Sequence, residues 1–469
     1  MTVLAFLVAL GVLVTVHEWA HYRVAVACGI QVLTFSVGFG KPLLRWKSPR
    51  PHPGQDTEFV IGLIPLGGYV RMLDATEGDV PPALLPRAFD RQPLRVRSAV
   101  VAAGPLANLL LAVVLYAVVF FTGQLETKAV VSSPIAGSIA QAAGVKSGDE
   151  ILRVGLSDDA LQDVRSMEDL RWWLMNLPGD AEQIWWEVQS QGVSGQQLLA
   201  LKLKAAESSP DATAPQQHRS AFLTDLSKLG IQGAWTAPVI GELQAGKPAQ
   251  RAGLSRGDVV LRIEGQRISD AAQLRQLVRA SGAEAAPEPQ VWEVQRRQHG
   301  VLLIEVTPER VQEGDESFGR IGAFIGGAPA TAWVELDIVQ SVSRALERTW
   351  DMSAMTLQLL TKMVLGEAEW RHLSGPLTMA DYAGRSASLG LTPYLLYLAA
   401  LSVSLGVFNL LPLPMLDGGH LMYYLYEAFT GRAPSQKWLD VMQRLGIAVL
   451  LGLMAVSLFN DVIRLGGLG

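Results

Sequence analysis

The feature that most limits how this chain can fold is a His-Glu-x-x-His motif inside an apolar run at the N-terminus. His17 and His21 are four residues apart, so on a helix their imidazoles share one face and can bind a single metal ion. Glu18 lies beside them, where a carboxylate can take a proton from the attacking water and return it to the leaving amine. In residues 1–16 the only polar side chains are two threonines. The sequence therefore predicts a membrane helix whose ionisable groups face the protein interior and have a function there.

A secretory signal peptide is the alternative interpretation of this run. Such a peptide needs a basic start and a small-residue cleavage site, whereas no Lys or Arg precedes Arg23. Composition also favours a membrane protein, because 49% of the 469 residues are hydrophobic and only 18% are charged. No basic stripe with interleaved aromatics is present, so we do not expect a nucleic-acid partner. The single cysteine, Cys28, excludes an internal disulfide.

Hydropathy predicts four membrane spans. They run over residues 3–27, 98–122, 392–411 and 445–459. The last is short enough that Arg444 and Asp461 would have to reach out of the membrane at its ends, and it could instead be a buried helix. Residues 29–97 contain nine Lys and Arg, while the N-terminus before the first span contains none. This loop is therefore expected in the cytoplasm, with residues 123–390 on the opposite side. The histidines then lie toward the cytoplasmic end of their helix.

Two segments of the first loop alternate in the manner of β-strands. Residues 31–40 and 57–66 are rich in β-branched and aromatic side chains, which predicts a hairpin-like sheet element. We expect Pro65 and the following Gly67-Gly68 to stop the second strand, with another beginning at residues 69–72. An exposed strand edge could receive a substrate peptide as an added strand. The residues that we assign to this role are Phe35, Val37, Phe39 and Val60.

The segment after the second span contains an internal repeat. Residues 136–149, Ala-Gly-Ser-Ile-Ala-Gln-Ala-Ala-Gly-Val-Lys-Ser-Gly-Asp, recur at 245–258 with a shift of 109 and no gap. Each copy is followed by a strand (150–154 and 259–263), a helix (167–177 and 271–279) and further strands. The copies resemble PDZ domains, which would bind an extended peptide or act only by their bulk. A helix at 332–365 has amphipathic spacing and is expected to lie on the membrane or on these domains.

A third metal ligand is expected at the end of the third span, because a catalytic zinc site has three protein ligands and one open position. In Asn-Leu-Leu-Pro-Leu-Pro-Met-Leu-Asp-Gly-Gly-His, residues 409–420, the prolines stop the helix at membrane depth and present Asp417 on irregular backbone. His420 could be the ligand instead, or Asp417 could cap a helix that begins near residue 421. Asn409 could hydrogen-bond the substrate or serve helix packing. Gly-Pro-Leu-Ala-Asn at 104–108 indicates close helix approach or a local break beside the site.

These motifs together resemble the site-2 protease family of intramembrane zinc metalloproteases. The resemblance covers nearly the whole chain: His-Glu-x-x-His, Gly-Phe-Gly, Gly-Gly-Tyr-Val, Gly-Pro-x-Ala-Asn, two PDZ-like repeats, Leu-Ser-Gly-Pro and Asn-x-x-Pro-x-Pro-x-Leu-Asp-Gly-Gly. It implies one Zn²⁺ ion on His17, His21 and Asp417, with Glu18 as the catalytic residue. It also implies an inner-membrane enzyme of regulated proteolysis in the envelope stress response, whose substrates are the membrane spans of an anti-sigma factor and of remnant signal peptides, with the PDZ pair as a size filter.

The expected fold is a multi-pass α-helical membrane protein of four spans, with a cytoplasmic membrane-associated β-hairpin element and two periplasmic PDZ domains of α+β type. A membrane-anchored PDZ scaffold or sensor with a non-catalytic metal site is the alternative function. The expected segments are 1–27 (first span with the zinc motif), 28–97 (cytoplasmic loop), 98–122 (second span), 123–230 and 231–312 (PDZ domains), 313–391 (periplasmic helix and linker), 392–420 (third span and Asp-Gly motif), 421–443 (cytoplasmic segment) and 444–461 (fourth span).

Overall fold

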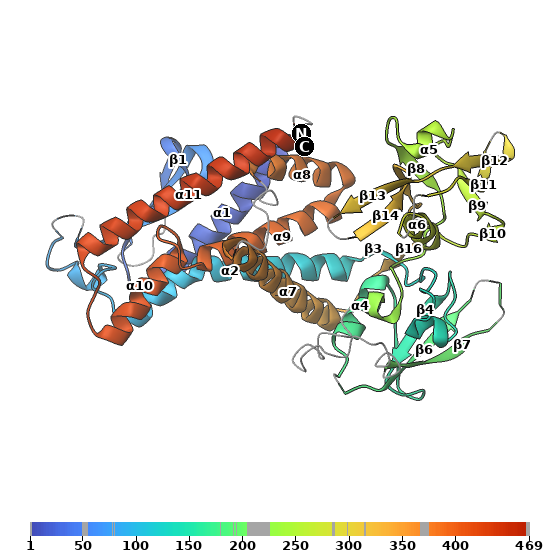
Figure 1. Cartoon of the computed structure of the whole chain (residues 1–469). Coiled ribbons are helices and arrows are strands. Elements are labelled where there is room, and N and C mark those ends of the chain that lie inside the picture. Colours follow the sequence, from blue (N-terminus) through green and yellow to red (C-terminus); the bar gives the residue numbers. More distant parts are fainter. Residues whose placement is uncertain are drawn as a thin grey trace. The chain divides into compact units, whose positions relative to one another are not determined.

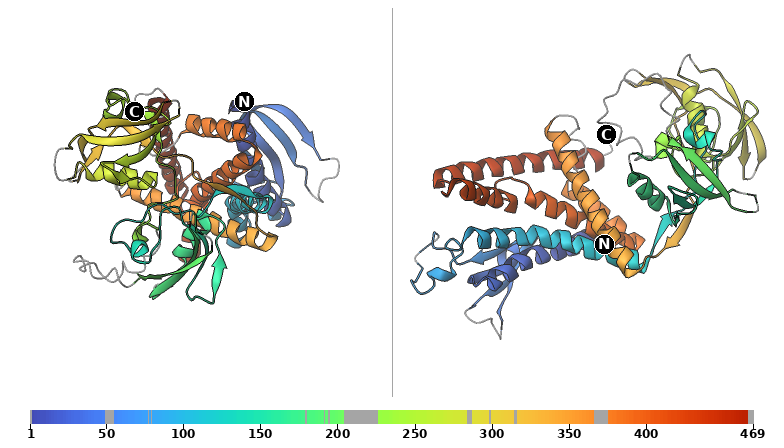
Figure 2. Two further views of the ribbon diagram at one scale, coloured as in Figure 1. Left: turned by 90° about the vertical axis from the view of Figure 1, so that its right-hand side faces the viewer. Right: turned by 90° about the horizontal axis from the view of Figure 1, so that it is seen from below.

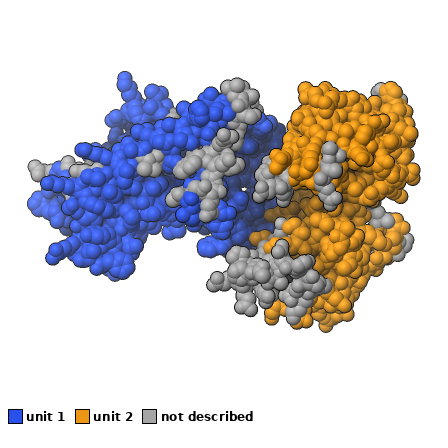
Figure 3. Space-filling view, in the orientation of Figure 1, with its two compact units in different colours: residues 1–124, 335–469 blue, residues 125–334 orange. Residues whose placement is uncertain are grey.

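The computed structural model divides the chain into two compact units, which Figure 3 colours separately. One unit comprises residues 1–124 and 335–469, and the other comprises residues 125–334. The structure describes residues 2–48, 55–76, 78, 80–178, 180–190, 192–193, 195–203, 226–283, 287–297, 299–313, 316–365 and 375–465. Residues 373 and 374 of the Leu-Ser-Gly-Pro motif lie outside these ranges.

Within the described residues of the first unit, four helices are long and apolar enough to cross a membrane, as the hydropathy predicted. The helices α1, α2 and α9 form a packed group in which α1 and α9 both contact α2, and α1 and α2 run side by side in Figures 1 and 2. The Tyr394 hydroxyl donates to the Ala5 carbonyl, and the Ser402 hydroxyl donates to the Asn108 carbonyl, so α9 is fastened to both neighbours. The bounds are α1 (Thr2–Ala27), α2 (Leu94–Thr122), α9 (Leu391–Leu410) and α11 (Gln436–Leu465).

The fourth predicted span is longer than expected, and one of its ends is buried. Helix α11 has 30 residues, and Asp461 is 1% exposed where we expected it to reach out of the membrane. Its carboxylate accepts hydrogen bonds from the backbone N–H groups of Gly375, Leu377 and Thr378 and from the Thr378 hydroxyl. These groups begin helix α8 (Pro376–Leu389), whose first amides have no partner within the helix. The Asp461 carboxylate can remain buried because these N–H and O–H groups donate hydrogen bonds to it.

Between α1 and α2 lie two long strands, β1 (Val32–Lys47) and β2 (Glu58–Met72). The expected stop of the second strand at Pro65 is wrong, because β2 continues through it to Met72. Gly67 has a φ of +107°, a value that glycine adopts readily, and this allows the strand to bend. The sheet is fastened to α1 by Tyr22, whose ring packs edge-on against Phe35 and Phe59.

The expected amphipathic helix at 332–365 begins later than predicted. Residues Thr331–Val334 form strand β16, which pairs with β3 (Gln124–Thr127), and α7 runs from Ile338 to Val364. The Asp337 side chain accepts a hydrogen bond from the backbone N–H of Gln340 and so caps α7, which explains why the helix begins there. Helix α7 packs against α2 and α9.

The second unit shows the same order of elements in both sequence repeats. Helices α3 (Ile139–Ala142) and α5 (Pro248–Arg251) begin 109 residues apart, as do strands β4 (Glu150–Gly155) and β9 (Val259–Ile263). Two four-stranded sheets result, with orders β5-β4-β6-β7 and β10-β9-β11-β12. The remaining bounds in these sheets and their helices are β5 (Leu161–Asp163), α4 (Met167–Met175), β6 (Gln183–Gln189), β7 (Gln197–Lys202), β10 (Gln266–Arg267), α6 (Ala271–Ala280), β11 (Gln290–Arg296) and β12 (Gly300–Val306).

The aspartate that ends each repeat motif has a structural role. Asp149 and Asp258 are both 1% exposed, and each accepts the backbone N–H three residues before it, from Lys146 and Ser255. A buried carboxylate in this position closes the turn that leads into the central strand. Shorter paired strands complete the unit: β8 (Ile240–Leu243) with β15 (Ala323–Ile325), and β13 (Glu309–Glu313) with β14 (Glu316–Arg320).

Candidate metal centre and active-site cavity

Helix α1 brings His17 and His21 together on its buried face. Their exposed fractions are 9% and 8%, and their Nε2 atoms are 3.1 Å apart. The outer nitrogen of each ring contacts helix α2. His21 Nδ1 is 2.7 Å from the Val100 carbonyl oxygen, and His17 Nδ1 is 3.1 Å from the carboxamide nitrogen of Asn108. Both rings are therefore held so that Nε2 points to the same place.

Asp417 reaches this place from the other end of the chain. Helix α9 ends at Leu410, as its prolines predicted, and α10 (Asp417–Thr430) begins at Asp417 itself, with Leu416 as its N-cap. The expectation of a helix that starts near residue 421 is wrong, and so is the alternative that Asp417 is its N-cap. The helix can start early because Gly418 packs directly on the Leu411 carbonyl, where an added Cβ would lie 2.1 Å from the oxygen.

The three side chains fit a divalent metal. Asp417 Oδ2 is 3.1 Å from His17 Nε2 and 3.6 Å from His21 Nε2, and the three ligand atoms lie within 4.8 Å of one another. Two imidazoles and one carboxylate are a donor set that zinc accepts with a fourth position open. Gly104 of α2 faces the same point, where a Cβ would come within 2.3 Å of His21 Nε2. Within the described ranges His420 does not belong to this cluster.

A cavity of ≈ 850 Å³ opens beside the three ligands, and all of its lining belongs to the first unit. Glu18 lines it, as do Asn409 and Phe39 among the predicted substrate-binding residues. Phe35, Val37 and Val60 do not line it. Further lining comes from the last part of β2 and from α10: Gly67, Gly68, Tyr69, Val70, Arg71, Met72, His420 and Tyr424.

The strand edge that faces the cavity is different from the one that we expected. Phe35 pairs with Val70 on one side and with Phe59 on the other, and Phe59 pairs again with Trp46. The strands around Phe35 and Val60 therefore have partners on both edges and cannot accept another strand. Among the described residues, 68–72 of β2 pair with β1 along one edge only, and they line the cavity. Local alternation could not reveal this, because both strands reverse direction along their length: β1 near Gly38 and Gly40, and β2 between residues 62 and 67.

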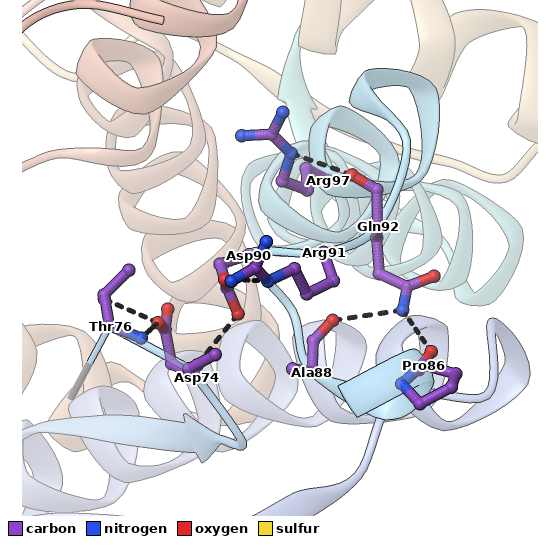
Figure 4. A network of polar contacts seen from close by, with 9 residues as sticks. Asp74, Thr76, Pro86, Ala88, Asp90, Arg91, Gln92 and Arg97 are labelled. Atoms are coloured by element: carbon purple, nitrogen blue, oxygen red, sulfur yellow. Dashed lines mark hydrogen bonds and ion pairs between the residues drawn. The ribbon is translucent and has the colours of Figure 1, made fainter. Parts of the chain in front are cut away.

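A polar network ties the loop before α2 to the first turn of that helix (Figure 4), and Arg97 extends it to helix α10. The Gln92 side-chain amide donates to the carbonyls of Pro86 and Ala88, and the Gln92 backbone carbonyl accepts from Arg97 Nε. Arg97 also pairs with Glu427 of α10 at 2.8 Å, and both side chains are about one-fifth exposed or less, at 17% and 20%. Since α10 starts with Asp417, this ion pair helps to fix the helix that supplies the carboxylate.

Helix α2 supplies two residues that surround the histidines, and the sequence did not predict their contacts with the rings. The Gly-Pro-x-Ala-Asn motif had indicated either close helix approach or a break, and α2 runs unbroken through Pro105. The close approach is made by Gly104 and Asn108, one turn apart on the face toward α1. Small residues four apart in an apolar helix were the available signal.

The chain is similar along nearly its whole length to proteins that are named as proteases. The profile described as Peptidase family M50 matches residues 5–453. A protein of Ralstonia nicotianae, named as a candidate zinc metalloprotease, is 37% identical over 99% of each chain. The regulator of sigma-E protease RseP of Escherichia coli K12 is 35% identical over 98% of each chain. The protein of Yersinia pestis named protease RseP is likewise 35% identical over 98% of each chain.

Proposed function

Because this chain belongs to peptidase family M50 and is an intramembrane zinc metalloendopeptidase, we propose that it cleaves the membrane spans of single-span proteins. The observation that carries the proposal is the cavity itself. It places Glu18, the cluster of His17, His21 and Asp417, and a strand edge around one space within a bundle of candidate membrane helices. A scaffold with a non-catalytic metal site, the alternative prediction, needs neither the carboxylate nor the strand edge.

In this proposal His17, His21 and Asp417 hold one Zn²⁺ ion. Bound zinc would polarise the scissile carbonyl and make water a stronger nucleophile at neutral pH. Glu18 lies against Gly68, where an added Cβ would be 2.8 Å from Glu18 Cγ, and it lines the same cavity as the three ligands. From there it takes the proton of the attacking water and passes it to the leaving amine. Asn409 lines the same cavity and can donate a hydrogen bond to the substrate backbone.

The substrate would bind as an added strand on residues 68–72. A helical span hides its carbonyls in internal hydrogen bonds, so it must unwind before hydrolysis, and a strand edge supplies new partners. The Leu73 amide donates to the Gln31 carbonyl on the β1 side. By alternation, the amides of Val70 and Met72 point to the opposite, outer edge.

A proline at Val70 tests this step. Val70→Pro removes one outward donor, whereas Val70→Ala keeps it, and an edge strand tolerates proline. We expect Val70→Pro to abolish cleavage of a co-expressed single-span protein while zinc content is unchanged, and Val70→Ala to remain active. Equal cleavage by the two variants would reject strand addition at this edge.

The remaining parts of the proposal concern topology and biology. The loop between α1 and α2 is cytoplasmic, the second unit is periplasmic, and the protein is in the bacterial inner membrane. The support is the nine Lys and Arg of residues 29–97 and the similarity to RseP proteins. We propose an anti-sigma factor and remnant signal peptides as substrates in the envelope stress response. The two repeats act as tandem PDZ domains that exclude substrates with large periplasmic parts or bind a peptide.

A further inference from the structure

Asn108 on α2 is a buried polar residue that takes no part in the catalytic steps proposed above. Its side chain is 0% exposed, and its carboxamide nitrogen is 3.1 Å from His17 Nδ1. Its carboxamide oxygen is also buried and has no hydrogen-bond partner among the described residues. An unpaired buried oxygen costs free energy, so its presence beside the metal ligands needs a physical reason.

The protonation of the two imidazoles supplies that reason. A neutral imidazole carries one proton, and a histidine that binds a metal through Nε2 must carry it on Nδ1. For His21 the Val100 carbonyl, at 2.7 Å, accepts this proton. For His17, in the part of the chain that the structure describes, the only polar group within hydrogen-bond distance of Nδ1 is the Asn108 carboxamide. The 3.1 Å separation suits either end of the amide, because a half turn about Cβ–Cγ exchanges oxygen and nitrogen.

We propose that Asn108 is the positioning residue for His17: its carboxamide oxygen accepts the Nδ1–H and thereby directs the lone pair of Nε2 to the metal. This inference rests on the proposed zinc site. The half turn pairs the oxygen with Nδ1–H and moves the NH2 group to the position that has no partner among the described residues, so the number of unpaired groups is unchanged. What it gains is an acceptor for Nδ1–H. The two histidines are then in equivalent arrangements, one held by a backbone carbonyl and one by a side-chain carbonyl. Outer partners of this kind set the tautomer and the ring orientation of ligating histidines.

The role requires a hydrogen-bond acceptor, and three substitutions separate this from mere packing. Asn108→Asp keeps an acceptor of nearly the same shape. Asn108→Leu keeps the branched shape and the number of side-chain heavy atoms without an acceptor, and Asn108→Ala has neither, so the test does not depend on the bulkier leucine being accommodated. Ser402→Ala is the control, because it removes the 2.7 Å hydrogen bond to the Asn108 backbone carbonyl and leaves the carboxamide in place.

The readout is zinc affinity, measured on the purified full-length protein by competition with a chelator, together with the unfolding temperature. We expect Asn108→Leu and Asn108→Ala to bind zinc about 10–100-fold more weakly than wild type. Asn108→Asp and Ser402→Ala should bind it as tightly as wild type. Wild-type affinity in the Leu and Ala variants, or an equal loss in the Asp variant, would overturn the role of Asn108. A wild-type protein that binds no zinc would overturn the proposed metal site as well, so the two failures are distinguishable.

Discussion

Replacing Gly104 with alanine should remove the metal while leaving the helix intact. The new Cβ would lie 2.3 Å from His21 Nε2 and 2.7 Å from His17 Nε2, whereas real Cβ contacts are essentially never shorter than 3.0 Å. His21 must therefore retreat by about 0.7 Å, the difference between 3.0 and 2.3 Å. Zinc–nitrogen distances tolerate only about ±0.2 Å around 2.0–2.1 Å. The displacement exceeds that tolerance more than threefold, and the hydrogen bond from His21 to Val100 opposes it.

We expect Gly104→Ala to weaken zinc binding by more than about 100-fold, which is beyond the loss caused by removing an outer partner of a ligand. Zinc content by elemental analysis and affinity by chelator competition measure this. Alanine is better than glycine inside a helix by about 1 kcal/mol. This offsets part of the about 1–3 kcal/mol that the new contact with the histidines costs, so the unfolding temperature of the metal-free protein should fall only slightly. Gly11→Ala in α1 is the matched control, since nothing lies within 4 Å of its added Cβ. A Gly104→Ala protein with wild-type zinc affinity would refute the placement of the metal between α1 and α2.

Two further predictions concern stability. Arg97→Leu leaves Glu427 without its cation and should lower the free energy of unfolding by about 1.5–3 kcal/mol. In thermal unfolding, the Arg97→Leu/Glu427→Leu double variant should recover part of this loss. No recovery would contradict the pairing. In the second unit, burial alone would raise the pKa of Asp258, but hydrogen bonds from Arg296 and the Ser255 amide outweigh burial and lower it. The folded-state pKa is thus below the unfolded one, so this stabilisation is present at neutral pH and is lost as pH falls through the folded pKa. The unfolding temperature should consequently drop less between about pH 6 and pH 3 in Arg296→Leu than in wild type, and an equal drop would argue against the assignment.

The sequence predicted those parts of the site that depend on local pattern. Helical spacing placed His17, Glu18 and His21 on one helix, and the prolines after Asn409 predicted where the chain unwinds to present Asp417. The length of the apolar runs alone predicted the four apolar helices, because a run of about 20 apolar residues matches the length of helix that a bilayer core requires.

The parts that the sequence could not predict depend on partners far apart in the chain. The order of segments in the β1–β2 sheet follows from a reversal of direction within each strand, and no alternation pattern encodes which edge remains open. Asp461 was expected outside the membrane because it is charged. Its hydrogen bonds to the start of α8 could not be predicted, since they form only when α8 lies against α11. Asn108 is 91 residues from His17, and the hydrogen bond between them has no local signature.

The central claim is that a metal held between membrane helices acts with Glu18 on another protein's membrane span. The most direct measurement combines zinc content with cleavage of a co-expressed single-span protein by wild type and by Glu18→Gln. Glutamine keeps the shape of the side chain but cannot accept the proton of the attacking water as a carboxylate does. We predict one zinc per chain in both proteins and cleavage by wild type alone. Cleavage by Glu18→Gln at the wild-type rate, or a wild-type protein that contains no zinc, would contradict the account.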